Sequence, residues 1–339
     1  MFSIVRDNRE AFYLGQDKKF FVFDATADID PRYDLDYVEI VDGKKYNNSL
    51  NMNITNVNIP TSKTTLCNSR KQSIKITEII KKYIKNRIVD GIGKQRRVLI
   101  VTYKNICNRF SSDFNYIGYF GNLKGFNDYK DIYKMAHIGM NRYSPMAYFY
   151  IYCGCHMDKY KELSEMSKKE SLEYLTNLMQ KQECQEFLND VMIRCILSDF
   201  EQNIFRLAIR NYENHDHVHI WTFYNIDGGI YGALSTAIEN RYKQYGVVFG
   251  YEDAPIEFQI SKLQDRKPPE GKEETNAQKI VNWRNSLPDK TGYKVKDLLN
   301  GTGLTNKQFQ KAKSKNLLLA NILKADKTDK KGYYCKKAM

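Results

Sequence analysis

The sequence predicts an α/β protein, in which helices cover both faces of a parallel sheet, followed by a small, mostly helical and basic C-terminal domain. The first 250 residues alternate short apolar runs with segments of helical spacing, as parallel strands joined by crossover helices do. The pattern then fades into Lys-Pro-Pro-Glu-Gly, which has linker composition. We therefore expect one domain over residues 1–254, a linker over 255–276 and a second domain over 277–339.

Short apolar runs mark the expected strands. Residues 97–102 are the clearest case, because they contain Val-Leu-Ile-Val without a polar interruption, as in a strand buried on both faces. The other expected strands are 20–23, 37–41, 51–59, 116–120, 148–152 and 217–224, and a further apolar run covers 135–139. Ligands of open α/β sheets bind beyond the carboxyl ends of the strands. We therefore expect functional residues in the loops that follow these runs.

Helical spacing leads to a candidate phosphate site. Residues 73–87 repeat isoleucine on a basic background, and residues 159–187 form a polar helical insertion. Beyond the insertion, Gln202, Arg206 and Arg210 are four residues apart, so on one helix they would share a stripe. Guanidinium groups in this arrangement can fork onto phosphoryl oxygens and stabilise the charge of a departing phosphoryl group. The alternative is an amphipathic helix whose arginines only pair with acidic residues.

Charge favours a polyanionic partner. The formal charge is +13, and the segment from residue 291 to the end holds twelve lysines against three aspartates, a net charge of +9. We find no apolar run of membrane-spanning length and no signal-peptide pattern, so we expect a cytoplasmic protein that does not engage a membrane. The seven cysteines sit mostly in apolar or helical patterns that suit reduced thiols. Cys153, Cys155 and His156 lack a second ligand pair with zinc-finger spacing, so we expect no metal there.

The C-terminal segment has a helix-turn-helix pattern. Residues 295–299 and 305–313 are short helical segments separated by Asn-Gly-Thr-Gly-Leu, and Thr305 is a favourable N-cap for the second. Residues 317–323 form a third apolar segment, and a lysine-rich hairpin around Gly332 would supply the wing of a winged helix. The lysines expected to meet nucleic acid are Lys307, Lys311 and Lys313. The alternative is a helical subdomain that only packs against the rest.

The order of these features resembles the second RecA-like domain, the C-terminal half, of a superfamily 2 DEAD/DEAH-like helicase with a winged-helix appendage. The resemblance to the motor part covers roughly residues 15–250. Asp24-Ala-Thr-Ala27 is similar to a short element that in this family couples nucleotide state to nucleic acid, which makes Asp24 and Thr26 the implied coupling residues. The resemblance also implies DNA or RNA as a partner, and ATP with Mg²⁺ as cofactors of the complete motor.

Three further segments resemble the parts of this family that touch nucleic acid. Residues 97–104 are similar to its strand and loop that contact the phosphate backbone. Residues 124–127 (Lys-Gly-Phe-Asn) and 139–142 (Gly-Met-Asn-Arg) are similar to its glycine-containing loops. The implied nucleic-acid-binding residues are Thr102, Lys104, Lys124, Gly125, Asn127, Asn141 and Arg142.

In the same resemblance, three residues complete the ATP site. Arg206 senses the γ-phosphate, Gln202 orients that phosphate or its attacking water, and Arg210 assists. The sequence departs from the family pattern at two places. Arg210 follows Arg206 by four residues where the family has three, and Phe205 stands where a glycine is common.

The sequence lacks the phosphate-cradling half of such a motor. It has no Gly-x-x-x-x-Gly-Lys-Ser/Thr and no convincing Asp-Glu pair after a strand, and Gly-Ile-Gly-Lys at 91–94 imitates only part of a P-loop. We therefore expect ATP hydrolysis only when a P-loop motor domain completes the site. That domain would come from another chain or from a longer parent protein.

Two other functions stay open. His217 and His219 alternate along one expected strand and Tyr242 lies downstream, an arrangement that resembles rolling-circle replication nucleases of the HUH type, in which histidines bind a metal and tyrosine attacks a DNA phosphate. The histidines could equally decorate an exposed strand face. The third possibility is a non-enzymatic nucleic-acid-binding replication scaffold, for which Gln202 and Arg206 would be dispensable.

Overall fold

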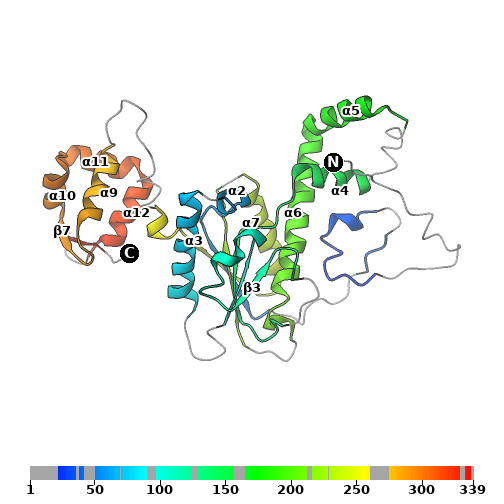
Figure 1. Cartoon of the computed structure of the whole chain (residues 1–339), viewed down its shortest axis with the longest axis horizontal. Coiled ribbons are helices and arrows are strands. Elements are labelled where there is room, and N and C mark those ends of the chain that lie inside the picture. Colours follow the sequence, from blue (N-terminus) through cyan, green and yellow to red (C-terminus); the bar gives the residue numbers. More distant parts are fainter. Residues whose placement is uncertain are drawn as a thin grey trace. The chain divides into compact units, whose positions relative to one another are not determined.

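The computed structural model of the 339-residue chain divides into two compact units. The larger contains Met1–Ser73 and Ile84–Glu252, and the smaller contains Ile74–Tyr83 and Asp253–Met339 (Figure 1). The residues that the structure describes are 22–35, 38–41, 50–68, 70–89, 97–123, 128–155, 165–211, 216–227, 229–259, 275–328 and 333–336.

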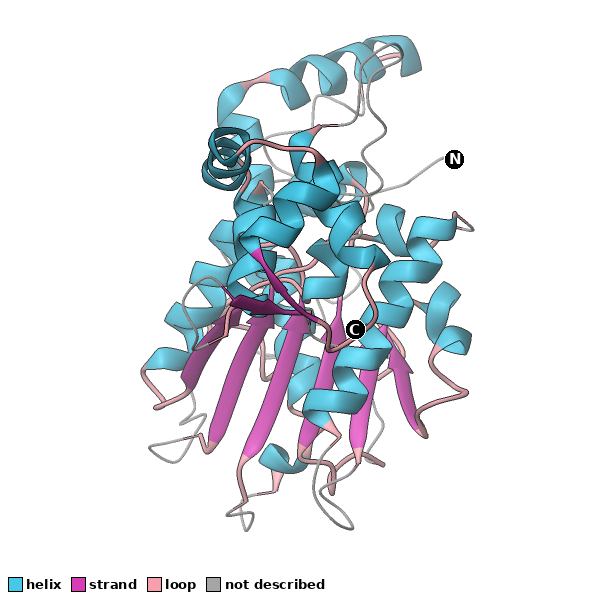
Figure 2. Cartoon of the chain, turned by 90° about the vertical axis from the view of Figure 1, so that its left-hand side faces the viewer, coloured by secondary structure: helices cyan, strands magenta, loops and turns pink. Residues whose placement is uncertain are grey.

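The described part of the larger unit contains one sheet of six strands. Their order is β3-β2-β4-β5-β1-β6, and every neighbouring pair is parallel (Figure 2). In chain order the strands are β1 (Met52–Val57), β2 (Val98–Thr102), β3 (Tyr116–Tyr119), β4 (Lys134–Ile138), β5 (Val218–Phe223) and β6 (Val248–Glu252). The carboxyl ends therefore lie along a single edge of the sheet. The expected α/β class and parallel sheet are confirmed.

The central strands are buried on both faces. On one face, Leu99 of β2 and Met135 of β4 belong to an apolar core formed with three helices. These helices are α4 (Pro145–Cys155), α6 (Gln182–Ile204) and α7 (Ile230–Lys243). Val98 and Ile100 point to the opposite face and are only 4% and 0% exposed. Burial on both faces explains why the sequence of β2 does not alternate between apolar and polar residues.

The remaining helical elements before β6 are mostly short. They are η1 (Pro31–Tyr33), α2 (Lys63–Leu66), α3 (Lys71–Tyr83), η2 (Ile84–Ile88), η4 (Lys104–Arg109), α5 (Lys168–Gln180) and η6 (Ala208–Arg210). The helix expected over residues 73–87 is confirmed as α3 followed by the single π-helical turn η2. The expected insertion over 159–187 contains α5 and the start of α6, and its residues 159–164 lie outside the described part.

The strand expected over residues 148–152 is wrong, because this segment is the middle of helix α4. An apolar run of this kind has the same pattern in a buried strand and in a buried helix. The residues that distinguish a helix from a strand are at the start of the segment. Pro145 occupies the first helical position, where its missing N–H is not needed, and the Ser144 hydroxyl accepts a hydrogen bond from Ala147 N at 3.3 Å.

The strands expected over residues 20–23 and 37–41 are also absent from the described part of those segments. Val22 and Phe23 are 70% and 97% exposed and have no strand structure, and neither do residues 38–41. Residues 20, 21 and 37 lie outside the described part. Local apolar content suits a strand, but a strand also needs a partner for its backbone hydrogen bonds.

The smaller unit ends in a compact group of helices and two short strands. They are α9 (Asn276–Ser286), β7 (Gly292–Lys294), α10 (Val295–Thr302), α11 (Asn306–Lys315), α12 (Leu317–Asp326) and β8 (Tyr333–Cys335). The three expected helical segments are present as α10, α11 and α12, and Thr305 caps α11 through a reciprocal capping box with Gln308. β8 pairs antiparallel with β7, and one antiparallel bridge joins Lys327 to Tyr334. Residues 329–332, including Gly332, lie outside the described part.

An ion pair is buried in the core of this unit. The side chains of Arg284 and Asp326 are 1% and 0% exposed, and Arg284 Nη2 donates to Asp326 Oδ1 at 2.7 Å. Tyr293 Oη donates to the second carboxylate oxygen at 2.7 Å. A buried charge that loses its partner is strongly destabilising, so these three residues hold α9, β7 and α12 in one arrangement.

Gly139 ties three strand ends of the larger unit together. It follows β4 with φ +85°, and its N–H donates to Phe223 O at the end of β5 at 3.0 Å. Tyr103, which follows β2, donates its hydroxyl to Thr61 O and Met140 O, both at 3.2 Å. A Cβ at Gly139 would lie 2.6 Å from the Tyr103 hydroxyl oxygen and 2.8 Å from Thr61 O. The loop therefore needs glycine for its backbone conformation and for space.

We predict that Gly139→Ala destabilises the protein more than Gly121→Ala does. Gly121 has nearly the same φ, +84°, but a Cβ added to it would meet nothing within 4 Å. Its substitution therefore costs only the energy of placing alanine in a left-handed backbone conformation. The extra crowding at Gly139 should add about 1–3 kcal/mol to the loss of unfolding free energy. Urea denaturation of both variants measures the difference. Equal losses would show that the contacts with Tyr103 and Thr61 do not constrain the loop.

Candidate functional site

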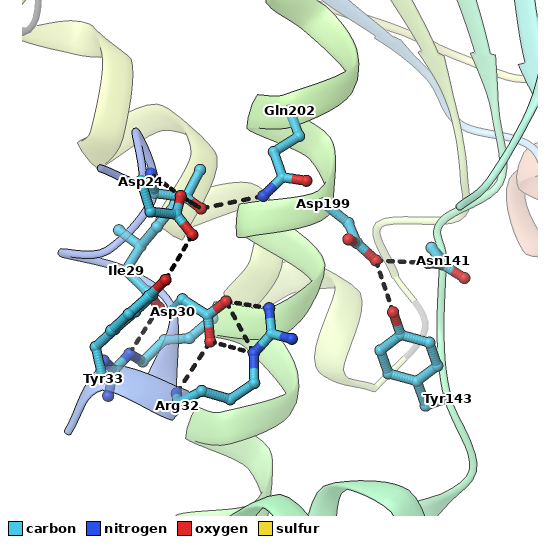
Figure 3. Close-up of polar contacts among 11 residues, drawn as sticks. Asp24, Ile29, Asp30, Arg32, Tyr33, Asn141, Tyr143, Asp199 and Gln202 are labelled. Atoms are coloured by element: carbon cyan, nitrogen blue, oxygen red, sulfur yellow. Dashed lines mark hydrogen bonds and ion pairs between the residues drawn. The ribbon is translucent and has the colours of Figure 1, made fainter. Parts of the chain in front are cut away.

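Residues 24–33 are bound to helix α6 through Gln202. Asp24 accepts hydrogen bonds from Thr26 N at 2.9 Å, Thr26 Oγ1 at 2.8 Å and Tyr33 Oη at 2.9 Å. Burial works against the charged form of Asp24, but these donors hold the pKa of its carboxyl below the ordinary value. The Thr26 hydroxyl in turn accepts a hydrogen bond from Gln202 Nε2 at 3.2 Å (Figure 3). The structure thus brings the expected coupling residues together with Gln202.

A buried carboxylate on α6 is linked to the same segment through an arginine. The Glu201 side chain is 2% exposed and receives a forked pair of hydrogen bonds from Arg241 of α7, at 2.8 and 3.0 Å. Tyr242 Oη donates to Glu201 at 3.1 Å. Arg241 also pairs with Asp28. This cluster joins α6, α7 and the 24–33 segment, and we did not expect it from the sequence because residues 28, 201 and 241 follow no local pattern.

The loop after β4 contacts α6 about one turn before Gln202. Asn141 donates its side-chain N–H to Asp199, and Tyr143 Oη donates to the same carboxylate at 3.2 Å (Figure 3). Arg142, between them in sequence, is exposed. The loop after β4 and the 24–33 segment therefore both contact α6. They do so at Asp199 and Gln202, which are one turn apart.

Arg206 and Arg210 do not continue the stripe of Gln202, so the expected single helix is corrected. Helix α6 ends at Ile204, a turn follows, and Arg210 closes the short helix η6. The Ala208 N–H donates to Ile132 O, just before β4, at 3.0 Å. This tertiary bond draws the chain away from the helix axis and toward the amino end of the sheet.

The two arginines are nonetheless electrostatic neighbours. Burial lowers the pKa of Arg206, and the charge of Arg210 lowers it further. Arg206 is half-buried and Arg210 is exposed.

The other expected nucleic-acid contacts differ in how accessible they are. Thr102 is fully buried, and its hydroxyl donates to Ile138 O at 3.3 Å, so its side chain serves the sheet. Lys104 is exposed, with its Nζ 5.6 Å from the centre of the Tyr119 ring. Lys124, Gly125 and Asn127 lie outside the described part of the chain.

In the smaller unit, three lysines of α11 lie opposite its buried side. Phe309 is 1% exposed and packs into the core of this unit. Lys307 and Lys311 are exposed, as is Lys315 one turn further along, whereas Lys313 is half-buried. The exposed stripe therefore consists of residues at i, i+4 and i+8.

Of the residues of the nuclease alternative, His219 and Tyr242 are engaged in packing, whereas His217 is exposed. His219 stacks on Trp221 at 3.6 Å between ring centres and shares a hydrogen bond of 2.9 Å with Thr55. Burial, with smaller contributions from His217 and Lys134, lowers the pKa of His219 to about 4. Tyr242 is fully buried against Glu201, where a nucleic-acid phosphate cannot reach its hydroxyl. This geometry does not favour nucleophilic catalysis.

No group of three or more His, Cys, Asp or Glu side chains suited to a metal ion occurs among the described residues. Of the cysteine and histidine motif at 153–156, Cys153 is buried, whereas the Cys155 side chain and His156 lie outside what the structure describes.

His137 links the loop after β4 to α6, and no sequence pattern indicated it. The ring is 1% exposed, between Phe120 and Phe200 at 5.1 Å from each. Nδ1 lies 2.9 Å from Gly139 O, so it carries the proton, and Nε2 accepts from Asn203 Nδ2 at 3.3 Å. Burial lowers the pKa of His137 to about 4, against the opposing effect of the Gly139 hydrogen bond.

Comparisons of the chain with protein-family models, curated proteins and solved structures give no match. Among the described residues, we find no helix with both the length and the hydropathy of a membrane span.

We predict that His137 makes the protein less stable in mild acid. An unfolded histidine titrates near pH 6.5, so between about pH 6.5 and 4 the unfolded state binds more protons than the folded state. The stability present above pH 6.5 is therefore lost as the pH falls, by up to about 1.4 kcal/mol per pH unit. Urea denaturation from pH 7.5 to 5 should show a slope that is smaller by this amount in His137→Gln. An unchanged slope would contradict the prediction.

Proposed function

We propose that the chain is the nucleic-acid-binding half of an ATP-dependent superfamily 2 helicase or translocase. In this proposal the larger unit is RecA-like. It supplies the γ-phosphate-sensing and backbone-contacting residues, and a P-loop motor domain from another chain or from a longer parent protein completes the hydrolase. The sequence lacks a P-loop and an Asp-Glu pair, so the residues present do not fit a complete ATP and Mg²⁺ site. The partner domain would bind Mg²⁺ and the inner phosphates.

The observation that carries this proposal is the hydrogen bond between Gln202 and Thr26. The resemblance assigns Thr26 to the coupling element and Gln202 to the ATP site, although the two residues are 176 positions apart. Contact between them is what a motor needs if occupancy of the nucleotide site is to alter the grip on nucleic acid. The Asp199 contacts of Asn141 support the same idea, because they bring a backbone-contacting loop to the neighbouring turn of α6.

The position of the exposed cations supports a nucleic-acid surface at the carboxyl edge of the sheet. Lys104 follows β2 and Arg142 follows β4, and these two strands are neighbours. Lys104 begins η4 and Arg142 lies in the loop after β4, so a phosphate backbone that crosses this edge would meet them in turn. In this arrangement Thr102 contributes through the loop that it holds, because its hydroxyl is buried.

We further propose that the end of the smaller unit is a winged-helix-like module that binds DNA or RNA. Its α10 ends at Gly303 in the left-handed conformation, and α11 begins shortly afterwards with its capping box, as in a helix-turn-helix. The β7–β8 pair would take the position of the wing. The exposed Lys307 and Lys311 then face the phosphates.

We predict that Arg206→Ala abolishes nucleic-acid-stimulated ATP hydrolysis by the assembled motor and leaves nucleic-acid binding intact. Loss of an arginine that stabilises the transferred phosphoryl group lowers turnover by roughly 10³- to 10⁵-fold. The measurement compares the purified chain alone, the chain with its native partner proteins, and the same assemblies with the variant. Arg70→Ala, which removes an exposed arginine of the same unit, is the matched control.

We expect ATP hydrolysis only when the partner is present. This activity should be lost in Arg206→Ala and kept in Arg70→Ala. Unchanged turnover in Arg206→Ala would contradict the assignment of this residue. Tight nucleic-acid binding without hydrolysis under any condition would instead support a replication scaffold.

We predict that the double substitution of Lys307 and Lys311 by Ala weakens nucleic-acid binding in a salt-dependent manner. Each lysine that neutralises a phosphate adds about 0.9 to the slope of log affinity against log salt, so the slope should fall by about 2. Fluorescence anisotropy over a salt series measures it. The control replaces Lys296 and Lys324, which are exposed on α10 and α12 and carry the same charge. An equal change in both double variants would argue for general attraction without a role for α11.

A further inference from the structure

Tyr143 presents an exposed aromatic ring at the carboxyl edge of the sheet. It lies in the loop between β4 and α4 and is 43% exposed. Its hydroxyl donates to Asp199 at 3.2 Å (Figure 3). Its backbone N–H donates to the hydroxyl of Tyr148, which is 2% exposed, and the two rings lie 5.8 Å apart. The ring is thus held at its hydroxyl, at its backbone and along one side, and part of it still reaches solvent.

A ring fixed in this way suits stacking against another flat group. Ordering a free side chain costs conformational entropy on binding, and the contacts with Asp199 and Tyr148 have already restricted Tyr143. An aromatic side chain that needed only to fill the core would be buried, as Tyr148 and Phe149 of the following helix are.

The charges around Tyr143 indicate what the flat group is. Arg142 precedes it and is exposed, and Lys104 is exposed on the loop that follows the neighbouring strand β2. Arg32, whose charge acts on Tyr143, is 59% exposed in its side chain and pairs with Asp30. An exposed aromatic ring on the same sheet edge as exposed cations is an arrangement that binds bases and phosphates of a single strand.

We propose that Tyr143 stacks against an unpaired base of single-stranded nucleic acid, while Arg142 and Lys104 bind the flanking phosphates. Bases within a duplex are covered on both faces by their neighbours, so they cannot stack on a protein ring without leaving the helix. This inference rests on the proposed function and deepens it, because it names the single strand as the substrate of this surface.

The test compares three substitutions in the full chain. Tyr143→Ala removes the ring, Tyr143→Phe keeps the ring without its bond to Asp199, and Tyr174→Ala removes a tyrosine of similar exposure, 41%, from α5. The probes are fluorescein-labelled oligodeoxythymidine and oligouridine of about 16 nucleotides and a blunt duplex of the same length. Thermal denaturation of each variant confirms that it is folded.

We expect Tyr143→Ala to weaken single-strand binding by roughly 5- to 100-fold, the effect of losing one stacked base. Tyr174→Ala should stay within about threefold of the original chain. Tyr143→Phe should lose less affinity than Tyr143→Ala, because it keeps the ring and loses only the bond to Asp199. Duplex binding should change little in all three variants. Unchanged single-strand affinity in Tyr143→Ala, or equal losses for single strand and duplex, would overturn the proposal.

A second measurement keeps the test independent of folding defects in the alanine variant. Tyr143→Trp places an indole at the same position, and its fluorescence should be quenched by oligodeoxythymidine, beyond any change in the original chain with its two tryptophans. No added quenching would overturn stacking. Loss of association with the P-loop partner in Tyr143→Ala, with single-strand affinity intact, would show that the ring contacts protein instead. Failure of the original chain to bind any nucleic acid would remove the proposed function itself.

Discussion

The arrangement of the candidate site depends on the pairing of one buried carboxylate. Glu201 is almost completely removed from water, and a buried charge is tolerated only when a partner of opposite charge and further hydrogen bonds compensate for its lost hydration. Arg241 supplies both, and its remaining N–H groups reach Asp28. One guanidinium therefore fixes α7 against α6 and holds the 24–33 segment beside them. Gln202 is the next residue after Glu201, so its contact with Thr26 follows from this pairing.

Residues along helix α6 contact each part of the candidate site. Asp199 binds the loop after β4, Gln202 binds the 24–33 segment, and Asn203 contacts His137 of β4. Because a helix is stiff over one or two turns, we expect a displacement at one of these contacts to shift the others. This is the physical basis on which we propose that events at a nucleotide are felt by the loops that hold nucleic acid. Arg206 lies just beyond the helix, where such a displacement would also move it.

Features with a local cause were predictable from the sequence. The strand over 97–102 is apolar because both of its faces are covered, and the start of α11 was predictable because Thr305 and Gln308 form a capping box. The helical conformation of α4 is hard to predict because its apolar run suits a buried strand as well, and Pro145 at its start is the local sign of a helix. Features with a tertiary cause were not predictable. The end of α6 carries neither glycine nor proline, and the bond from Ala208 to Ile132 determines the path of the chain after it. The pairing of Arg241 with both Glu201 and Asp28 joins three segments that no sequence period relates. The sequence identifies Gln202 and Thr26 as candidates, but only the structure shows that they are in contact.

The most direct test of the central claim is photo-crosslinking from the γ-phosphate of ATP in the complex with the P-loop partner. An ATP analogue with a photoreactive group on the γ-phosphate would be irradiated in the assembled motor with nucleic acid present, and the labelled peptides identified by mass spectrometry. We expect labelling of the peptide that contains Gln202 and Arg206, together with the P-loop of the partner. Labelling of the partner alone would contradict the claim that this chain completes the ATP site.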